Sequence, residues 1–323
     1  MKIRVGIVGY GNVGRGAALA VLSAPDMELP AVFTRRDPKS VDAPDGVDVF
    51  RVSDALSMAG QIDVMLLCGG SATDLPEQGP YFAKHFNIVD SFDTHAKIPE
   101  YLSAVDAVAK NKTAVVASGW DPGLFSLMRV FSEAVLPAGS TYTFWGKGVS
   151  QGHSDAIRRI PGVTNAVQYT IPIESAISSV RSGGFPVFET REKHLRECFV
   201  VTDDGADEAA IEKSIKEMPN YFDDYDTTVH FVEESEILKN HSKMPHGGLV
   251  MRSGVTGENN SHVIEFSLKL DSNPEFTGSI IAAYARAAFR MSLEGNFGAK
   301  TVFDIPPSYL SENTREEIIR KLL

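Results

Sequence analysis

The chain has few cysteines, no CxxC pair and no metal-binding histidine motif, and these absences disfavour two classes of protein. Of its 323 residues, only Cys68 and Cys198 are cysteines, and each lies in an apolar stretch. A disulfide scaffold or a structural zinc site needs more thiols at closer spacing. We therefore interpret both cysteines as small buried hydrophobic side chains. The chain also lacks HExxH, and the sequence predicts neither a metal site nor a serine nucleophile.

The chain also lacks a long hydrophobic run and a basic cluster. No apolar run approaches about 20 residues, and no signal-peptide pattern precedes the first strand, so we expect a cytoplasmic protein without a membrane span. Its 31 Lys and Arg against 42 Asp and Glu give a net charge of −11. The longest basic runs are the pairs Arg35-Arg36 and Arg158-Arg159. Nucleic acid is therefore not an expected partner, and an anionic ligand must be recognised by a few aimed residues.

The first part of the chain alternates apolar strand-like runs with helical segments. Short runs rich in Val, Ile and Leu occupy residues 3–8, 28–33, 63–67, 87–90 and 113–117. Helical patterns at 15–22 and 97–111 separate some of them. This alternation predicts an α/β fold, an N-terminal Rossmann domain with a doubly wound parallel sheet over residues 1–118.

The pattern changes after residue 118. A helix over 123–136 leads into strand-like segments at 141–145, 166–171, 197–202, 227–232 and 262–270, with a helix at 204–218. This order predicts a second α+β domain over 119–276, for substrate binding and dimerisation, on a mostly antiparallel open sheet. An Ala-rich helix at about 277–293 is apolar on most faces, so we expect it to pack back on the first domain. Residues 294–323 would form a C-terminal tail.

The first strand is followed by Gly9-Tyr10-Gly11-Asn12-Val13-Gly14, and a helix follows the last glycine. In this context a GxGxxG loop indicates dinucleotide binding. Gly9 would permit the tight turn, Gly11 would let the backbone approach a pyrophosphate, and Gly14 would allow close packing of the helix. The helix N-terminus would offer its N–H groups to the phosphates. The alternative is a glycine turn that binds nothing.

The end of the second strand indicates which dinucleotide binds. An acidic residue there would bind the ribose of NAD, but this chain has Thr34-Arg35-Arg36. Two guanidinium groups and a hydroxyl suit a 2′-phosphate, so we expect NADP, unless the arginine pair is only part of a solvated loop. Cys68-Gly69-Gly70-Ser71-Ala72-Thr73 follows the third strand, where the backbone can pass beneath the adenosine ribose and the pyrophosphate.

Two loops at the carboxyl ends of the later strands combine a carboxylate with an aromatic residue. Asp93 lies beside Phe92, and Asp121 follows Trp120. A substrate that carries an ammonium group needs such acceptors to orient the amine and to take its proton. Each residue also has a structural alternative, because Asp121-Pro122 is typical of a helix start and Asp93 could cap the next helix.

Polar residues also stand among glycines and aromatics in the second domain. His153 and His246 could bind a ligand or be ordinary loop histidines. Ser154 could cap a helix that extends through Ile160. Arg196, in a strand-like stretch, could simply pair with an acidic residue.

Taken together, these motifs resemble those of the meso-diaminopimelate D-dehydrogenases. The resemblance rests on stretches from most of the chain: Val8–Asn12, Gly70–Asp74 with Pro76–Gln78, Gly119–Gly123, Thr143–Gly146, Ser150–Ala156, Arg158–Val163, Ala166–Thr170, Met244–Gly248 and Leu268–Asp271 with Asn273-Pro274. Ser150 to Val163 is the most specific of them. The loop 37–52, residues 178–192 and the C-terminal tail are the parts that vary.

The resemblance implies NADP-dependent oxidative deamination at the D-centre of meso-2,6-diaminopimelate, which yields L-2-amino-6-oxopimelate and ammonia. The reverse reaction would supply a lysine and cell-wall precursor. The resemblance also implies a homodimer built through the second domain. Asp93 and Asp121 would contact the amine at the D-end. Other implied contacts are the pocket walls at Trp120, Phe144 and Trp145, a carboxylate contact at Gln151, Gly152 and His153, and a distal site at Thr170, Arg196, His246 and Asn273.

Three alternative functions remain open on the sequence. A broader D-amino acid dehydrogenase of the same family would share every motif. A sugar or semialdehyde dehydrogenase of similar architecture would carry Glu-Lys-Pro, where this chain has Ala96-Lys97-Ile98-Pro99. A non-catalytic NADP(H) sensor would need the glycine loop but not the polar residues of the second domain.

Overall fold

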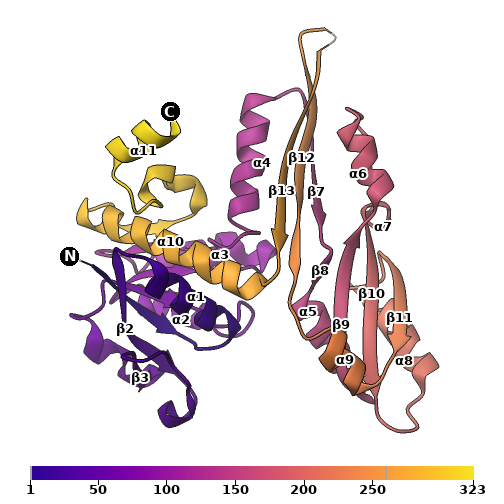
Figure 1. Cartoon of the computed structure of the whole chain (residues 1–323), viewed down its shortest axis with the longest axis horizontal. Coiled ribbons are helices and arrows are strands. Elements are labelled where there is room, and N and C mark those ends of the chain that lie inside the picture. The colour runs from indigo at the N-terminus through magenta and orange to yellow at the C-terminus, as the bar shows by residue number, and fades with distance from the viewer. Residues whose placement is uncertain (1, 259) are drawn as a thin grey trace. The chain divides into compact units, whose positions relative to one another are not determined.

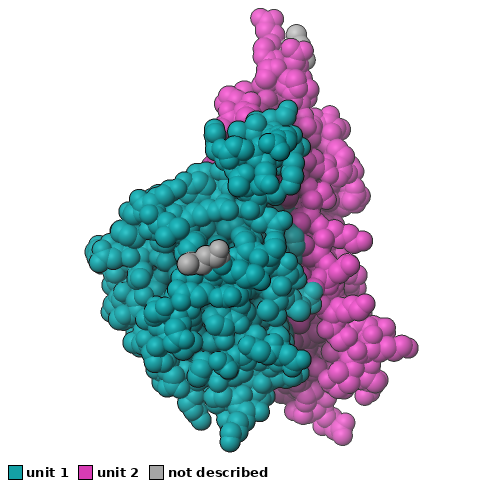
Figure 2. Space-filling model, turned by 60° about the vertical axis from the view of Figure 1, so that its left-hand side comes forward, with its two compact units in different colours: residues 1–127, 274–323 teal, residues 128–273 magenta. Residues whose placement is uncertain are grey.

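The computed structural model describes residues 2–258 and 260–323 and divides into two compact units (Figure 2). Unit 1 contains the residues up to Leu127 together with Pro274–Leu323, and unit 2 is Met128–Asn273. Residues 119–127, which we expected in the second domain, therefore belong to unit 1. The same holds for residues 294–323, which we expected as a separate tail.

Unit 1 is built on a parallel sheet of seven strands in the order β14-β6-β5-β4-β1-β2-β3. The bounds are β1 (Ile3–Val8), β2 (Met27–Thr34), β3 (Asp48–Arg51), β4 (Val64–Leu67), β5 (Asn87–Asp90), β6 (Thr113–Val115) and β14 (Gly298–Lys300). The predicted Rossmann-like α/β fold is confirmed. Edge strands β3 and β14 carry little apolar pattern, so the sequence did not predict them.

Helices cover both faces of this sheet, which explains why its strands are apolar throughout. They are α1 (Asn12–Ser23), α2 (Leu75–Phe82), α3 (Ile98–Asp106) and α10 (Asn273–Leu293) (Figure 1). Helix α4 (Leu124–Val135) follows the sixth strand and runs from unit 1 into unit 2, and α11 (Arg315–Leu322), near the end of the chain, has no buried residue. Alternate residues of β4 enter different cores. Val64 and Leu66 belong to one buried cluster, and Met65 and Leu67 to the other.

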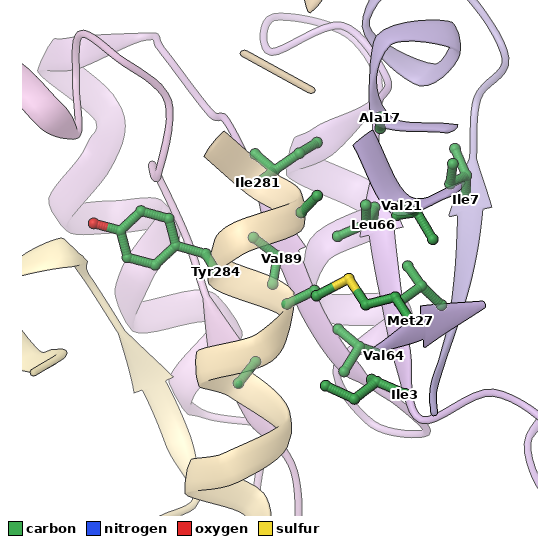
Figure 3. Close-up of a cluster of buried hydrophobic side chains, with 14 of the residues drawn as sticks. Ile3, Ile7, Ala17, Val21, Met27, Val64, Leu66, Val89, Ile281 and Tyr284 are labelled. Atoms are coloured by element: carbon green, nitrogen blue, oxygen red, sulfur yellow. The ribbon is translucent and has the colours of Figure 1, made fainter. Parts of the chain in front are cut away.

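Helix α10 lies in the first of these cores, although it is far from β1 in the sequence. Its Ile281 and Tyr284 share the buried cluster with Ile7 and Val21 (Figure 3). The backbones of α1 and α10 approach so closely that a Cβ on Gly278 would lie 2.3 Å from the backbone nitrogen of Ala17. Burial of the apolar faces explains this packing, since a helix that is apolar on most sides must be covered.

Unit 2 carries two sheets, where the sequence pointed to one open sheet. The four-stranded sheet has the order β11-β10-β9-β8, and the antiparallel three-stranded sheet has the order β13-β12-β7. β10 is antiparallel to β9 and parallel to β11. The strands are β7 (Gly139–Trp145), β8 (Gly148–Val149), β9 (Val163–Pro172), β10 (His194–Thr202), β11 (Asp226–Phe231), β12 (His246–Thr256) and β13 (Asn260–Leu270). The helices are α5 (Gln151–Arg158), α6 (Glu174–Arg181), α7 (Thr190–Lys193), α8 (Glu208–Lys216) and α9 (Glu234–Asn240).

Two kinds of feature are absent from the described residues. No helix there is both long and apolar enough to span a bilayer. No group of three or more His, Cys, Asp or Glu side chains in residues 2–258 and 260–323 could hold a metal ion.

Candidate active site

A cavity of about 290 Å³ opens in unit 1 at the carboxyl ends of β1, β2 and β4. Eight of the predicted cofactor-binding residues line it, namely Gly9, Gly11, Thr34, Arg35, Arg36, Cys68, Gly69 and Gly70. Asn12, Val13, Gly14, Ser71, Ala72 and Thr73 do not line it. The lining also includes residues that we did not select, namely Val8, Tyr10, Arg15, Val52, Asp74 and Gln78.

The three glycines of the first loop have different surroundings. Gly9 has φ +89°, a left-handed conformation that side chains disfavour. A Cβ on Gly14 would lie 2.1 Å from the carbonyl oxygen of Gly9, so the helix can approach the turn only without a side chain there. A Cβ on Gly11 would meet no atom within 4 Å. Because Gly11 lines the cavity and has space in front of it, a ligand can approach its backbone.

The N-terminus of α1 suits an anion. Its N-cap Gly11 supplies no side-chain hydrogen bond, and no acidic residue lies in the first turn, so the N–H groups there keep their positive field. The buried Oε1 of Gln78, which also lines the cavity, has no hydrogen-bond partner. Uncapped N–H groups beside an unpartnered amide oxygen fit a ligand that carries both phosphates and polar donors.

Arg35 and Arg36 reach into the same cavity but make different contacts. Arg36 donates through Nη2 to the carbonyl oxygen of Tyr10, at 2.8 Å. Arg35 is paired with the carboxylate of Asp74, which also accepts the N–H of Gly70 at 3.0 Å. Arg35 is therefore not simply a solvated side chain, because a counter-ion holds it at the cavity.

The loops that carry Asp93 and Asp121 both follow strands of the parallel sheet in unit 1. Asp93 is exposed, and its N–H donates to Ser71 Oγ at 3.0 Å. The helical turn after Asp93 has Thr94 at its N-cap, and α4 begins at Leu124, directly after Gly123. Neither aspartate therefore stands at the N-cap position that the structural alternatives required. Trp120 is 8% exposed and packs edge-on against Phe125.

A fully buried aspartate, Asp90, lies at the base of both loops. Its carboxylate accepts hydrogen bonds from the N–H groups of Phe92 and Ala117, each at 3.0 Å, and from the Tyr101 hydroxyl at 2.6 Å. Burial raises the pKa of Asp90 to about 6, although these hydrogen bonds favour the charged form. Ala117 has φ +54°, which costs a residue with a Cβ roughly 1–2 kcal/mol.

In unit 2, the strand register brings Thr170, Arg196 and His246 together. Thr170 on β9 lies opposite Arg196 on β10 and opposite Gly148 on β8. Arg196 donates through Nη1 to Thr170 Oγ1. A Cβ on Gly148 would lie 2.5 Å from the His246 ring, so this ring occupies the face that a Gly148 side chain would cover. Residues directly opposite in a sheet point to the same face, so the three side chains gather on one surface.

Arg196 is a buried cation without a carboxylate partner among the described residues, so the expected alternative of pairing with an acid does not hold. It is 7% exposed, its Nε has no hydrogen-bond partner, and its guanidinium lies 3.9 Å from the centre of the Tyr225 ring. Burial lowers the pKa of Arg196. An unpaired buried guanidinium is costly, and an anionic ligand would remove that cost.

His194 fixes the backbone of Trp145. The Trp145 N–H donates to His194 Nε2 at 2.8 Å, and the two rings stack with centroids 5.3 Å apart. Burial lowers the pKa of His194 to about 3, so the ring is a neutral acceptor. Phe144, expected in the pocket wall, is fully buried and packs edge-on against Phe188.

The predicted carboxylate contacts Gln151, Gly152 and His153 form the first turn of α5. Ser150, rather than Ser154, is the N-cap of this helix. The His153 ring contacts Ser150 Oγ through Nδ1 at 2.7 Å, and burial, with a smaller effect of Arg196, lowers the pKa of His153 to about 4. Asn273 donates its backbone N–H to the carbonyl oxygen of Met244, two residues before His246.

Comparison with known proteins gives these features a family. The family model for the diaminopimelic acid dehydrogenase C-terminal domain matches residues 119–272. The meso-diaminopimelate D-dehydrogenase of Ureibacillus thermosphaericus is 64% identical over 100% of this chain and 99% of its own length. The chain belongs to the meso-diaminopimelate D-dehydrogenase family.

Solved structures agree with this family assignment. A substitution variant of meso-diaminopimelate dehydrogenase from Clostridium tetani, solved with DAP, matches with a TM-score of 0.95 and 52% identity, over 100% of both chains. An engineered D-amino acid dehydrogenase bound to NADP+ matches with a TM-score of 0.89 and 43% identity, over 100% of both chains. The predicted oxidoreductase family and the predicted NADP-binding Rossmann fold are therefore confirmed.

Among the residues that sequence reasoning missed, Asp74 and Gln78 lay in stretches already quoted for the family resemblance. Their acidic and amide side chains gave no direct indication of a cofactor role, since a carboxylate is an unexpected neighbour for a phosphate. Asp90, which stands three residues before Asp93, is not among the predicted site residues. A polar residue that ends a fully apolar strand is the pattern that could have identified it.

Proposed function

We propose that this member of the family catalyses NADP-dependent, reversible oxidative deamination at the D-centre of meso-2,6-diaminopimelate, giving L-2-amino-6-oxopimelate and ammonia. The observation that carries the proposal is the buried Arg196, which has no acidic partner in residues 2–258 and 260–323 and bonds to Thr170 beside the His246 ring. A simple D-amino acid has no group for such a site. A substrate with a second, distal carboxylate does.

At the distal end, Arg196, Thr170 and His246 would bind the L-centre carboxylate, and Asn273 would contact the same amino acid centre. The Clostridium tetani variant supports this set. The residues substituted in it are a glutamine, a threonine, an arginine, a proline, a histidine and an asparagine. The same residue types recur in this chain, in the same order and at the same intervals, as Gln151, Thr170, Arg196, Pro245, His246 and Asn273. Pro245 thereby joins the proposed substrate-binding residues.

At the reacting end, Asp93 and Asp121 would accept hydrogen bonds from the D-centre ammonium. Trp120 and Trp145 would supply apolar walls, and the N–H groups of Gln151, Gly152 and His153 would hold the neighbouring carboxylate. Phe144 is fully buried, so it would support the pocket wall from inside unit 2 and would not line it. As the D-carbon loses hydride, the amine gives a proton to an aspartate or to water. Water then adds to the imine, and ammonia leaves.

The cavity of unit 1 fits NADP. The uncapped turn at Gly11 would hold the pyrophosphate, and Thr34, Arg35 and Arg36 would hold the 2′-phosphate. The unpartnered Oε1 of Gln78 offers an acceptor on the same wall. When bound, NADP+ supplies the hydride acceptor. The remaining predicted cofactor contacts, at Asn12, Val13, Gly14, Ser71, Ala72 and Thr73, would act through the backbone near this cavity.

A single assay tests the reaction. NADPH formation is followed with meso-, LL- and DD-diaminopimelate and with simple D-amino acids as separate substrates. We expect NADP+ to be reduced with the meso isomer and with none of the other substrates. Activity on simple D-amino acids would favour the broader D-amino acid dehydrogenase, and binding of NADPH without turnover of any substrate would favour the sensor.

We further propose a homodimer that forms through unit 2, and a cytoplasmic enzyme whose reverse reaction supplies a lysine and cell-wall precursor. Exposed apolar side chains on α4 support the dimer. Val130, Phe131 and Val135 are 50%, 61% and 52% exposed, and such a stripe is typical of an interaction surface. Light scattering on the eluting protein should give twice the 35.1 kDa chain mass, and a monomer would refute this arrangement.

A further inference from the structure

Among the residues that the structure describes, Asp90 is the one buried carboxylate whose hydrogen bonds reach both loops of the reacting end. It is 0% exposed at the last position of β5. Among the described residues no cation pairs with it. A buried carboxylate without a cation is costly, so its hydrogen bonds have to compensate that cost.

One oxygen of this carboxylate joins the two loops. Oδ1 accepts the N–H of Phe92, the residue directly before Asp93, and the N–H of Ala117, which opens the loop to Trp120 and Asp121. The backbone oxygen of Asp90 also accepts from Ser118, through its N–H at 3.0 Å and its Oγ at 2.8 Å.

The opposite oxygen fixes the orientation of the carboxylate. Oδ2 accepts the Tyr101 hydroxyl at 2.6 Å, and the Tyr101 ring stacks on Phe92 with centroids 4.2 Å apart. The carboxyl plane therefore cannot rotate without breaking a bond at each end. Ala117 is held at φ +54°, a conformation that persists only when the surroundings impose it.

We propose that Asp90 is a positioning residue, which sets the separation of Asp93 and Asp121 by binding the start of both loops through one carboxylate oxygen. This role rests on the proposed function of the two aspartates at the D-centre. Side chains that contact a substrate need a supporting layer of this kind, because small misplacements slow hydride transfer without abolishing binding.

The first test compares turnover in Asp90→Ala and Asp90→Asn. Asp90→Ala loses both amide contacts, so kcat with meso-diaminopimelate should fall by about 10²-fold while the affinity for NADPH is unchanged. Asp90→Asn keeps Oδ1, so it should restore most of the rate. The primary isotope effect with substrate deuterated at the D-carbon should rise in Asp90→Ala, which a merely structural defect would not cause.

Asn87→Ala is the matched control. Asn87 begins the same strand, and its Oδ1 accepts the N–H of Thr113 on β6 at 2.9 Å, at the opposite end of the strand pair. This variant should lower stability and leave kcat and the isotope effect unchanged. Wild-type turnover in Asp90→Ala, or equal loss of kcat in the control, would overturn the proposal.

Amide hydrogen exchange tests the same contacts without turnover. Segments 91–97 and 117–123 should exchange faster in Asp90→Ala than in the wild type, while α1 stays protected. If Asp90→Ala does not fold, Asp90→Ser takes its place, because a short hydroxyl cannot reach both amides. Unchanged exchange in both segments would refute the positioning role. Absence of turnover in the wild-type enzyme would instead refute the proposed function.

Discussion

Arg35 and Asp74 form a bidentate ion pair at the wall of the proposed cofactor cavity, with Nη1–Oδ1 and Nη2–Oδ2 distances of 2.8 and 3.1 Å. The side chain of Arg35 is 71% exposed and that of Asp74 is 13% exposed. A phosphate that approaches Arg35 therefore meets a guanidinium whose outer edge already binds a carboxylate, and the two anions compete for it.

The first prediction is that Asp74→Asn strengthens NADP+ binding. The amide oxygen can still accept the Gly70 N–H. Because the side chain is now neutral, it no longer repels the 2′-phosphate or forms an ion pair with Arg35. Because exposed ion pairs contribute about 0–1 kcal/mol, the gain should be at most about fivefold. Titration of NADPH fluorescence measures it. Weaker binding would mean that Asp74 orients Arg35 for the phosphate rather than competing with it.

The second prediction concerns the arginine pair itself. Arg35→Ala and Arg36→Ala should each weaken NADP+ by about 10- to 100-fold, since a hydrogen bond to a charged group contributes about 1.5–3 kcal/mol. NAD+ lacks the 2′-phosphate, so its dissociation constant should hardly change. Equal losses for the two cofactors would refute the assignment of this wall to the 2′-phosphate.

The third prediction separates two glycines of the first loop. Gly11→Ala meets no atom within 4 Å and has φ −92°, so thermal stability should be retained while NADPH binding is lost, because the methyl group takes the space of a phosphate. Gly14→Ala would place a Cβ 2.1 Å from the Gly9 oxygen, so overpacking should cost about 1–3 kcal/mol of stability as well. Calorimetry measures the thermal stability of both variants, and titration with NADPH measures their cofactor affinity.

The fourth prediction addresses the distal site. Arg196→Met should lower kcat/KM for meso-diaminopimelate by roughly 10²- to 10³-fold, because removing one partner of a buried charge pair costs about 2–5 kcal/mol. Any residual rate on a D-amino acid without a distal carboxylate should not fall, because that substrate never uses Arg196. An equal loss of kcat/KM on both substrates would mean that Arg196 stabilises the fold and does not recognise the distal carboxylate.

The fifth prediction follows from His194. Its folded pKa of about 3 lies below the value of about 6.5 expected for an unfolded chain, so the unfolded state binds more protons as the pH falls. The stability due to neutral His194 is complete above about pH 6.5 and is lost toward pH 3. His153, with its pKa also lowered, adds to this loss, and Asp90, with its pKa raised, opposes it below about pH 6.

The matched variant is His194→Gln, whose amide oxygen can still accept the Trp145 N–H. His153 and Asp90 are present in both proteins, so their effects cancel in the difference. Between pH 7 and pH 5 the wild type should lose about 2 kcal/mol more than the variant in urea unfolding. Identical pH dependence in the two proteins would show that His194 does not stay neutral in the fold.

The sequence by itself determined the Rossmann fold, the glycine loop and the type of cofactor. These features depend on local patterns, since a glycine turn between a strand and a helix sets its own geometry, and the carboxyl ends of parallel strands meet at one edge. The family resemblance likewise depends on short segments that keep their spacing.

Only the tertiary structure decided the features that join distant segments. Asp74 reaches Arg35 across 39 positions, and Asp90 reaches Ala117 across 27. Whether Arg196 has an acidic partner depends on three strands and the residues packed on them. Burial and pairing of charged groups arise from such long-range packing, so residue type and spacing alone do not reveal them.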